Sequence, residues 1–157
     1  MDSQHTKTID YDAIYNVQLD FINDKNEWWK KNNYFGVPLD VHLRDSRTIH
    51  MGGPRQAGKS QWSYKQLKED QHTSMVVVND SLRNVAIANG KVSPQDAIRI
   101  FTVHEIKKFI KDDELPYIGK RIILDDALYI FDRLDFRSFY KWIALKQDWD
   151  LHIIKMS

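Results

Sequence analysis

The feature that most constrains the fold of this chain is a glycine-rich octapeptide, GPRQAGKS, at residues 53–60. Its glycines stand where the backbone must curl tightly, since a Cβ there would block left-handed angles or the close approach of a bound group. Residues 48–51 before it are β-prone, and residues 61–70 after it are rich in helix formers and lack Gly and Pro. The order strand, glycine loop, helix therefore predicts a βα unit.

The same loop predicts a class of ligand. In the pattern G-x-x-x-x-G-K-[ST], backbone N–H groups and a helix N-terminus surround phosphates, the lysine reaches the β- and γ-phosphates, and the hydroxyl binds Mg²⁺. Here Lys59 and Ser60 take those roles, so we expect a nucleoside triphosphate, ATP, with Mg²⁺. The expected nucleotide-binding residues are Gly53, Pro54, Arg55, Gln56, Ala57, Gly58, Lys59, Ser60 and Gln61.

Length and composition limit the alternatives. A chain of 157 residues with 42% hydrophobic residues is expected to form one ordinary domain, and the absence of cysteine excludes disulfides and cysteine-bound zinc. No apolar run is long enough to span a bilayer and the first residues are polar, which predicts a cytoplasmic protein with no membrane partner, in the host cytoplasm if it is viral. The net charge is +1, so any contact with DNA requires a local basic patch.

Periodicity and punctuation predict the fold class. One or two helices are expected in residues 9–29, where Ile14, Val17, Phe21 and Trp28 have roughly helical spacing, followed by a connector. Apolar runs predict strands at 48–51, 75–79, 98–103, 121–126 and 151–156, and helices are expected at 61–70, from 104 or 105 to 111, and at 136–147. We therefore expect an α/β fold, a parallel five-stranded sheet with helices on both faces. An N-terminal helical segment, 1–47, would precede a core at 48–157.

A second constellation follows the fourth expected strand. Asp125 and Asp126 come directly after the run Ile122-Ile123-Leu124. Ligands of parallel sheets bind at the carboxyl ends of the strands, so Asp125 is expected to hold Mg²⁺, directly or through water, opposite Ser60. An acidic turn after a buried strand is also common without any such role.

Together these residues resemble the Walker A and Walker B motifs of P-loop NTPases, over about residues 48–157. The chain looks most like the branch with an additional catalytic acid, which includes AAA-type ATPases, helicases and viral DNA-packaging terminases and has a RecA/AAA-like core. In that branch a glutamate after the Walker B aspartate polarises the attacking water, and its place falls on Asp126. Because Asp is one methylene shorter, the resemblance implies hydrolysis that is slow or completed by a partner.

Two further residues acquire roles from the resemblance. Arg55 lies in a Pro-Arg-Gln segment similar to that of some prokaryotic ATPases and large terminases, and is expected either to reach the γ-phosphate or to pair with a surface carboxylate. Ser157 follows the last expected strand, which resembles the strand inserted between the Walker A and Walker B strands, where a polar residue senses the γ-phosphate. Ser157 is expected either to take that place or to fray as the last residue. The implied catalytic set is Lys59, Asp126 and Arg55.

Other patterns are weaker. The aromatic and basic stretch at residues 28–35 fits either stacking on bases or a cap on the core. Arg133 and Arg137 fit either a solvated helix face or a charge supplied to a neighbouring subunit's phosphates. His104-Glu105 starts like a zinc motif but lacks the second histidine.

Three functions remain open on this basis. The first is an ATPase of the DNA-motor type from a phage or mobile element, acting as a homo-oligomer or as a subunit of a larger assembly. The second is a small nucleoside kinase, since residues 125–131 also look like the acidic-aromatic run of thymidine kinases, although the cysteine-bound zinc lobe of that family is missing. The third is a nucleotide-gated binding module with weak turnover.

Overall fold

The computed structural model describes residues 9–32, 36–54 and 58–157. Within these residues the chain forms seven α-helices and five β-strands, with two short 3₁₀ turns at Asp96–Arg99 and Ala144–Lys146. The elements are α1 (Tyr11–Lys31), α2 (Leu39–Ser46), β1 (Thr48–Met51), α3 (Lys59–Glu69), β2 (Thr73–Val77), α4 (Asp80–Ala88), β3 (Ile100–Thr102), α5 (Val103–Lys111), β4 (Arg121–Leu124), α6 (Ala127–Arg133), α7 (Phe136–Ile143) and β5 (His152–Met156).

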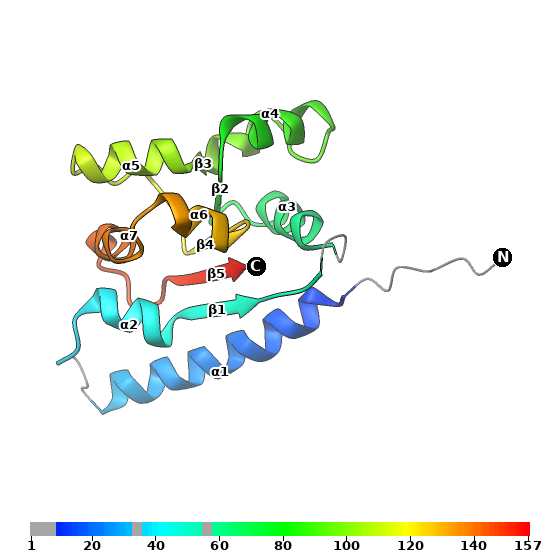
Figure 1. Ribbon diagram of the computed structural model, residues 1–157. Helices are drawn as coiled ribbons and strands as arrows, with labels where there is room; N and C mark the ends of the chain where they lie inside the picture. The colour runs from blue at the N-terminus through cyan, green and yellow to red at the C-terminus, as the bar shows by residue number, and fades with distance from the viewer. Residues whose placement is uncertain (1–8, 33–35, 55–57) are drawn as a thin grey trace.

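The five strands form one sheet in which every pairing is parallel, in the order β1-β5-β4-β2-β3 (Figure 1). The expected parallel five-stranded sheet is confirmed. The last strand lies between the strand before the glycine loop and the strand before Asp125, which is the position expected for it. Because the strands are parallel, all their carboxyl ends meet at one edge of the sheet.

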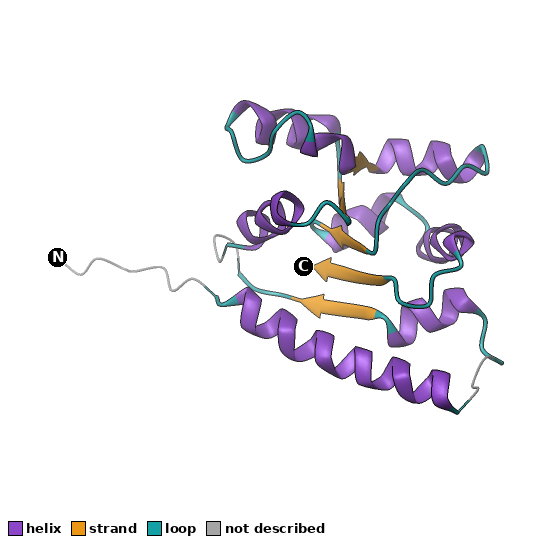
Figure 2. Ribbon diagram, turned by 180° about the vertical axis from the view of Figure 1, so that it is seen from behind, coloured by secondary structure: helices purple, strands orange, loops and turns teal. Residues whose placement is uncertain are grey.

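Each face of the sheet has its own core, and helices cover both (Figure 2). Ile154 is paired in register with Ile49 and with Ile123, and this row packs with side chains from α1, α3 and α4. The alternate residues Ile122 and Ile153 pack with α2, α5, α6 and α7 on the other face. The inner strands β2 and β4 are buried along their whole length on both faces, as in other parallel sheets, whereas the edge strand β1 exposes His50 on one face.

Helix α1 runs along β1 at the edge of the sheet (Figure 1). It is one helix, capped by the Asp10 side chain, which accepts a hydrogen bond from the Ala13 N–H. Its buried face carries Tyr11, Tyr15 and Ile22, whereas the residues whose spacing predicted the helix face outward. Ile14, Val17, Phe21 and Trp28 are 38%, 71%, 68% and 54% exposed.

Three helices were not expected. The connector that we expected before the first strand contains α2, the segment after β2 forms α4, and the residues after Asp126 form α6. Helix α4 has a local signal, since the Asn79 side chain accepts a hydrogen bond from the Leu82 N–H and caps it.

Several expected boundaries were too long. β3 begins at Ile100 rather than at 98, because Asp96–Arg99 forms a 3₁₀ turn, and α7 ends at Ile143. Phe139, Trp142 and Ile143 are buried, as the helical pattern indicated, but Leu145 lies in the 3₁₀ turn after the helix and is 49% exposed. Over the part of the chain that the structure describes, no helix has both the length and the apolarity to cross a bilayer.

Candidate functional site

The site is built at the carboxyl edge of the sheet, where β1, β4 and β5 end beside one another. β1 runs into Gly52 and the glycine loop, and β4 runs into Asp125. The Asp125 N–H donates to the Val76 carbonyl at 3.0 Å, which extends the β2–β4 ladder by one more bond and fixes where its side chain begins. Sequence positions far apart are therefore held together by the ladder itself.

Helix α3 starts at this edge. Gly58 precedes it with φ of +91°, a left-handed conformation that costs glycine little, and its carbonyl accepts the first helical bond from Trp62 at 2.9 Å. Trp62 and Leu67 are buried against the sheet, and the Trp62 indole N–H donates to Asp12 of α1 at 2.8 Å. These contacts hold the N-terminus of α3, with its partial positive charge, over the site.

Ser60 and Asp125 face each other across the site. The Ser60 Oγ lies 3.4 Å from both carboxylate oxygens of Asp125, which is long for an O–H···O hydrogen bond. Burial, and then the charge of Asp126, raise the pKa of Asp125 to about 6, whereas the Ser60 hydroxyl, Lys59 and Lys91 act in the opposite direction. The site thus contains a carboxylate whose negative charge is only partly compensated by the neighbouring lysines and hydroxyl.

Asp126 begins α6 in a strained conformation. Its φ and ψ are 66° and 63°, in the left-handed region that aspartate tolerates better than most residues. The side chain is exposed, while Ala127 and Ile130 behind it are buried. The backbone turn therefore leads the chain from a buried strand into a helix and leaves the Asp126 carboxylate at the surface of the site.

Six of the expected site residues line one pocket of roughly 350 Å³. A seventh lining residue, Leu82, comes from α4 and was missed because that helix was not expected. The lining residues are Gly58, Lys59, Ser60, Gln61, Leu82, Asp125 and Asp126.

The remaining loop residues are less informative. Gly53 and Pro54 follow β1 and do not line this pocket, and Arg55, Gln56 and Ala57 lie outside the described residues. The roles expected for these five residues stay predictions.

Ser157 lies near the site but outside its pocket. Its N–H donates to the Met51 carbonyl at 3.0 Å, and its side chain lines a separate hollow of roughly 460 Å³ with His50 and Lys155. Its expected role as a phosphate sensor remains a prediction.

The other sequence candidates lie elsewhere. Arg133 and Arg137 are exposed, and neither forms an ion pair with another described residue. Of the aromatic stretch 28–35, Trp28 is largely exposed and residues 33–35 lie outside the described residues. The alternatives stated for them stay open.

The donors present fit Mg²⁺ bound together with phosphates. Mg²⁺ prefers oxygen ligands and usually takes one or two carboxylates, with waters and substrate phosphates completing its shell. Ser60 and Asp125 supply a hydroxyl and a carboxylate, and the raised pKa of Asp125 is the effect that a nearby cation would relieve. Among the described residues there is no cluster of three or more His, Asp or Glu side chains that could hold a metal on their own. A metal at this site would therefore need phosphate oxygens or waters as further ligands.

In comparisons with known proteins, no family model, curated protein or solved structure matches the chain.

Proposed function

We propose that this chain is a P-loop ATPase of the branch with an additional catalytic acid, which binds ATP with Mg²⁺ in this pocket and hydrolyses it. The observation that carries the proposal is the position of Ser60, at the N-terminus of α3, 3.4 Å from the carboxylate of Asp125 at the end of β4. A phosphate-binding loop and a metal-binding acid are expected to meet in this way at the carboxyl edge of a parallel sheet, and here they follow β1 and β4, on either side of β5.

Each residue has a distinct task in this proposal. Lys59 and the backbone N–H groups at the start of α3 bind the β- and γ-phosphates. Ser60 and Asp125 would hold Mg²⁺, which would neutralise charge on the phosphate oxygens. Asp126 accepts a proton from water as the water oxygen bonds to the γ-phosphorus and the bond to the β–γ bridging oxygen breaks.

Two variants test the binding and hydrolysis steps separately. Lys59→Ala should abolish nucleotide binding, measured by the fluorescence of a labelled ATP analogue in the presence of Mg²⁺. Asp126→Asn should retain that binding and lose phosphate release by about 100-fold or more. Turnover that survives in Asp126→Asn would remove the catalytic assignment, and binding that survives in Lys59→Ala would remove the site.

The wider role that we propose is in a DNA motor of a phage or mobile element, as a homo-oligomer or as a subunit of a larger assembly. One support for this role is the resemblance of the motifs to those of such motors. The other is that Asp126 is exposed to solvent, so a partner chain can reach the pocket. Phosphate release should then increase when DNA is added, whereas transfer of phosphate to a nucleoside in a panel of acceptors would indicate a kinase instead.

One observation favours a second candidate, a nucleotide-gated binding module with weak turnover. The Asp126 side chain makes no hydrogen bond to any other described residue, so nothing in the described part of the chain orients its short side chain toward a water molecule. Tight ATP binding with phosphate release unchanged by DNA would support this candidate.

A further inference from the structure

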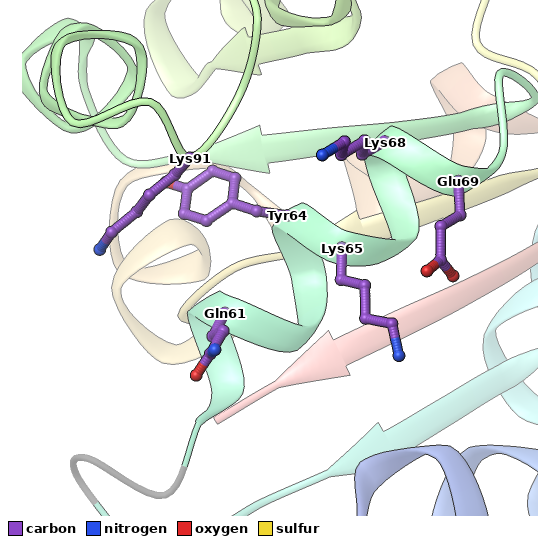
Figure 3. Close-up of a pocket in the computed structure, with 6 residues that line it drawn as sticks. All are labelled: Gln61, Tyr64, Lys65, Lys68, Glu69 and Lys91. Atoms are coloured by element: carbon purple, nitrogen blue, oxygen red, sulfur yellow. The ribbon is translucent and has the colours of Figure 1, made fainter.

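A further hollow, of roughly 530 Å³, lies along α3 (Figure 3). It adjoins the pocket of roughly 350 Å³ between Lys59 and Asp125, which we call the phosphate pocket. We call the hollow along α3 the lysine hollow; it is lined by Gln61, Tyr64, Lys65, Lys68, Glu69 and Lys91. All but one of these residues belong to α3, and Lys91 comes from the segment after α4.

The lysine hollow is positively charged in a chain that is nearly neutral. It has three lysines and one carboxylate, against a net charge of +1 for the whole chain. Lys65 pairs with Asp12 at 3.6 Å, but both side chains are 53% exposed, so the pair contributes little. Neither Lys68 nor Lys91 has a carboxylate within 4.0 Å among the described residues. The hollow therefore presents unneutralised cations to an anionic ligand.

An aromatic side chain forms one wall of the lysine hollow. Tyr64 extends from α3 toward Lys91, and most of its ring is covered by neighbouring residues, leaving 7% of the residue exposed (Figure 3). Because so little of Tyr64 is exposed, it shapes the wall of the hollow and offers no face on which a base could stack. A nucleic-acid strand would therefore be held through its phosphates, each of which carries a negative charge that a lysine can neutralise.

The lysine hollow also shares groups with the phosphate pocket. Gln61 lines both. The positive charge of Lys91 acts on the Asp125 carboxylate, and that carboxylate acts on Tyr64. An anion bound to Lys91 would therefore alter the electrostatic environment of the metal-binding acid.

We propose that the lysine hollow binds the phosphate backbone of a single-stranded nucleic acid. This inference rests on the proposed function in one respect, namely that it identifies the DNA-contacting surface of the ATPase. Binding of the strand itself needs no nucleotide, so the two proposals can fail separately.

The test is the fluorescence anisotropy of a labelled oligo(dT) strand, measured without nucleotide at low salt. The double variant Lys68→Glu/Lys91→Glu should weaken binding by about 10-fold or more, because two phosphate contacts are replaced by repulsion. The slope of log affinity against log salt should also fall by about 1.4. The matched control is Lys107→Glu/Lys108→Glu, which makes the same charge change at two exposed residues of α5.

Three results would overturn the inference: no binding by the wild-type chain, equal weakening by the two double variants, or a polyglutamate chain that binds as tightly and depends on the same two lysines. Urea unfolding of each variant checks that it is folded. Lys59→Ala separates the proposals, since it should lose ATP binding and retain oligo(dT) binding. If the wild-type chain bound ATP but not oligo(dT), this inference would be wrong and the proposed function would still stand.

Discussion

At the scale of single residues, Gly119 is a position that does not accept a side chain without movement of the backbone. It lies before β4 with φ of +71°, and a Cβ there would run into the backbone of His72, whose carbonyl accepts a hydrogen bond from Lys120 at 2.7 Å. Gly119→Ala should therefore lower the free energy of unfolding by about 3 kcal/mol or more, measured by urea denaturation. Gly90 is the control, because it has the same φ but open space where a Cβ would lie, and Gly90→Ala should cost only about 1–2 kcal/mol. Equal costs would show that the His72 contact is unimportant.

Asp125 illustrates the conflict between stability and function at one residue. Asp125 is half-buried beside Asp126, and its raised pKa means that the charged form destabilises the protein without a bound cation. Asp125→Asn should raise the free energy of unfolding by about 1–3 kcal/mol at neutral pH, in buffer that contains EDTA and no nucleotide. The same variant should bind Mg²⁺ and ATP more weakly. A less stable Asp125→Asn protein would show that its hydrogen bonds outweigh the charge burial.

At the scale of elements, α1 offers a test of which helix face supports the fold. Phe21 and Ile22 are neighbours in sequence, but Phe21 is 68% exposed and Ile22 is 7% exposed in the core beneath α1. Ile22→Ala should lower the free energy of unfolding by about 2–4 kcal/mol, whereas Phe21→Ala should change it by less than about 0.5 kcal/mol. Thermal or urea unfolding of the two variants measures the difference. A larger loss for Phe21→Ala would mean that the outward face of α1 is covered in solution.

The elements that could be predicted from the sequence are those with a strong apolar run or a long periodic pattern. All five strands were expected close to their positions because each contains buried apolar residues, such as Met75 and Ile123. The helices that were missed are short and have weak patterns: α4 buries only Ala86, and α6 spans seven residues after a left-handed Asp126 that provides no side-chain cap. For α1 the helical period was clear but the wrong face seemed apolar, because the buried face carries two tyrosines and an asparagine and only one aliphatic residue, Ile22.

At the scale of the whole molecule, the candidate site could be predicted because it depends on topology more than on side-chain detail. Ser60 and Asp125 are far apart in sequence, and the parallel sheet brings them together. Leu82 and the lysine hollow could not be predicted, since they depend on where α4 and its following segment pack. Position along a strand can be inferred from a motif, whereas the packing of a surface helix depends on weak contacts spread over many residues.

Two buried histidines link α1 to the rest of the molecule. The ring of His42, in α2, is hydrogen-bonded to the Asn26 side chain at 3.0 Å, and that of His152, in β5, to the Tyr15 hydroxyl at 2.8 Å. Burial, followed by nearby positive charges including Arg47, lowers the pKa of His42 to about 4 and that of His152 to about 3. Both rings are therefore neutral in the folded chain at physiological pH.

These shifts predict a loss of stability in acid. In the unfolded chain both histidines have a pKa near 6.5, so below that pH the unfolded state binds protons that the folded state does not. The stability is complete above about pH 6.5 and falls as the pH decreases toward 4, by about 2 kcal/mol per histidine at pH 5. Urea unfolding at pH 7.5 and 5.0 measures the loss.

The background and the controls decide whether the histidines are responsible. Asp125 acts in the opposite direction, because its raised pKa makes the folded state bind a proton first, so the comparison is best made in Asp125→Asn protein. His104→Gln, at an exposed position of α5, should leave the acid loss unchanged, whereas His152→Gln should reduce it by about half. If the free energy of unfolding were the same at both pH values, the two rings would not be held neutral, and the docking of α1 would not depend on their burial.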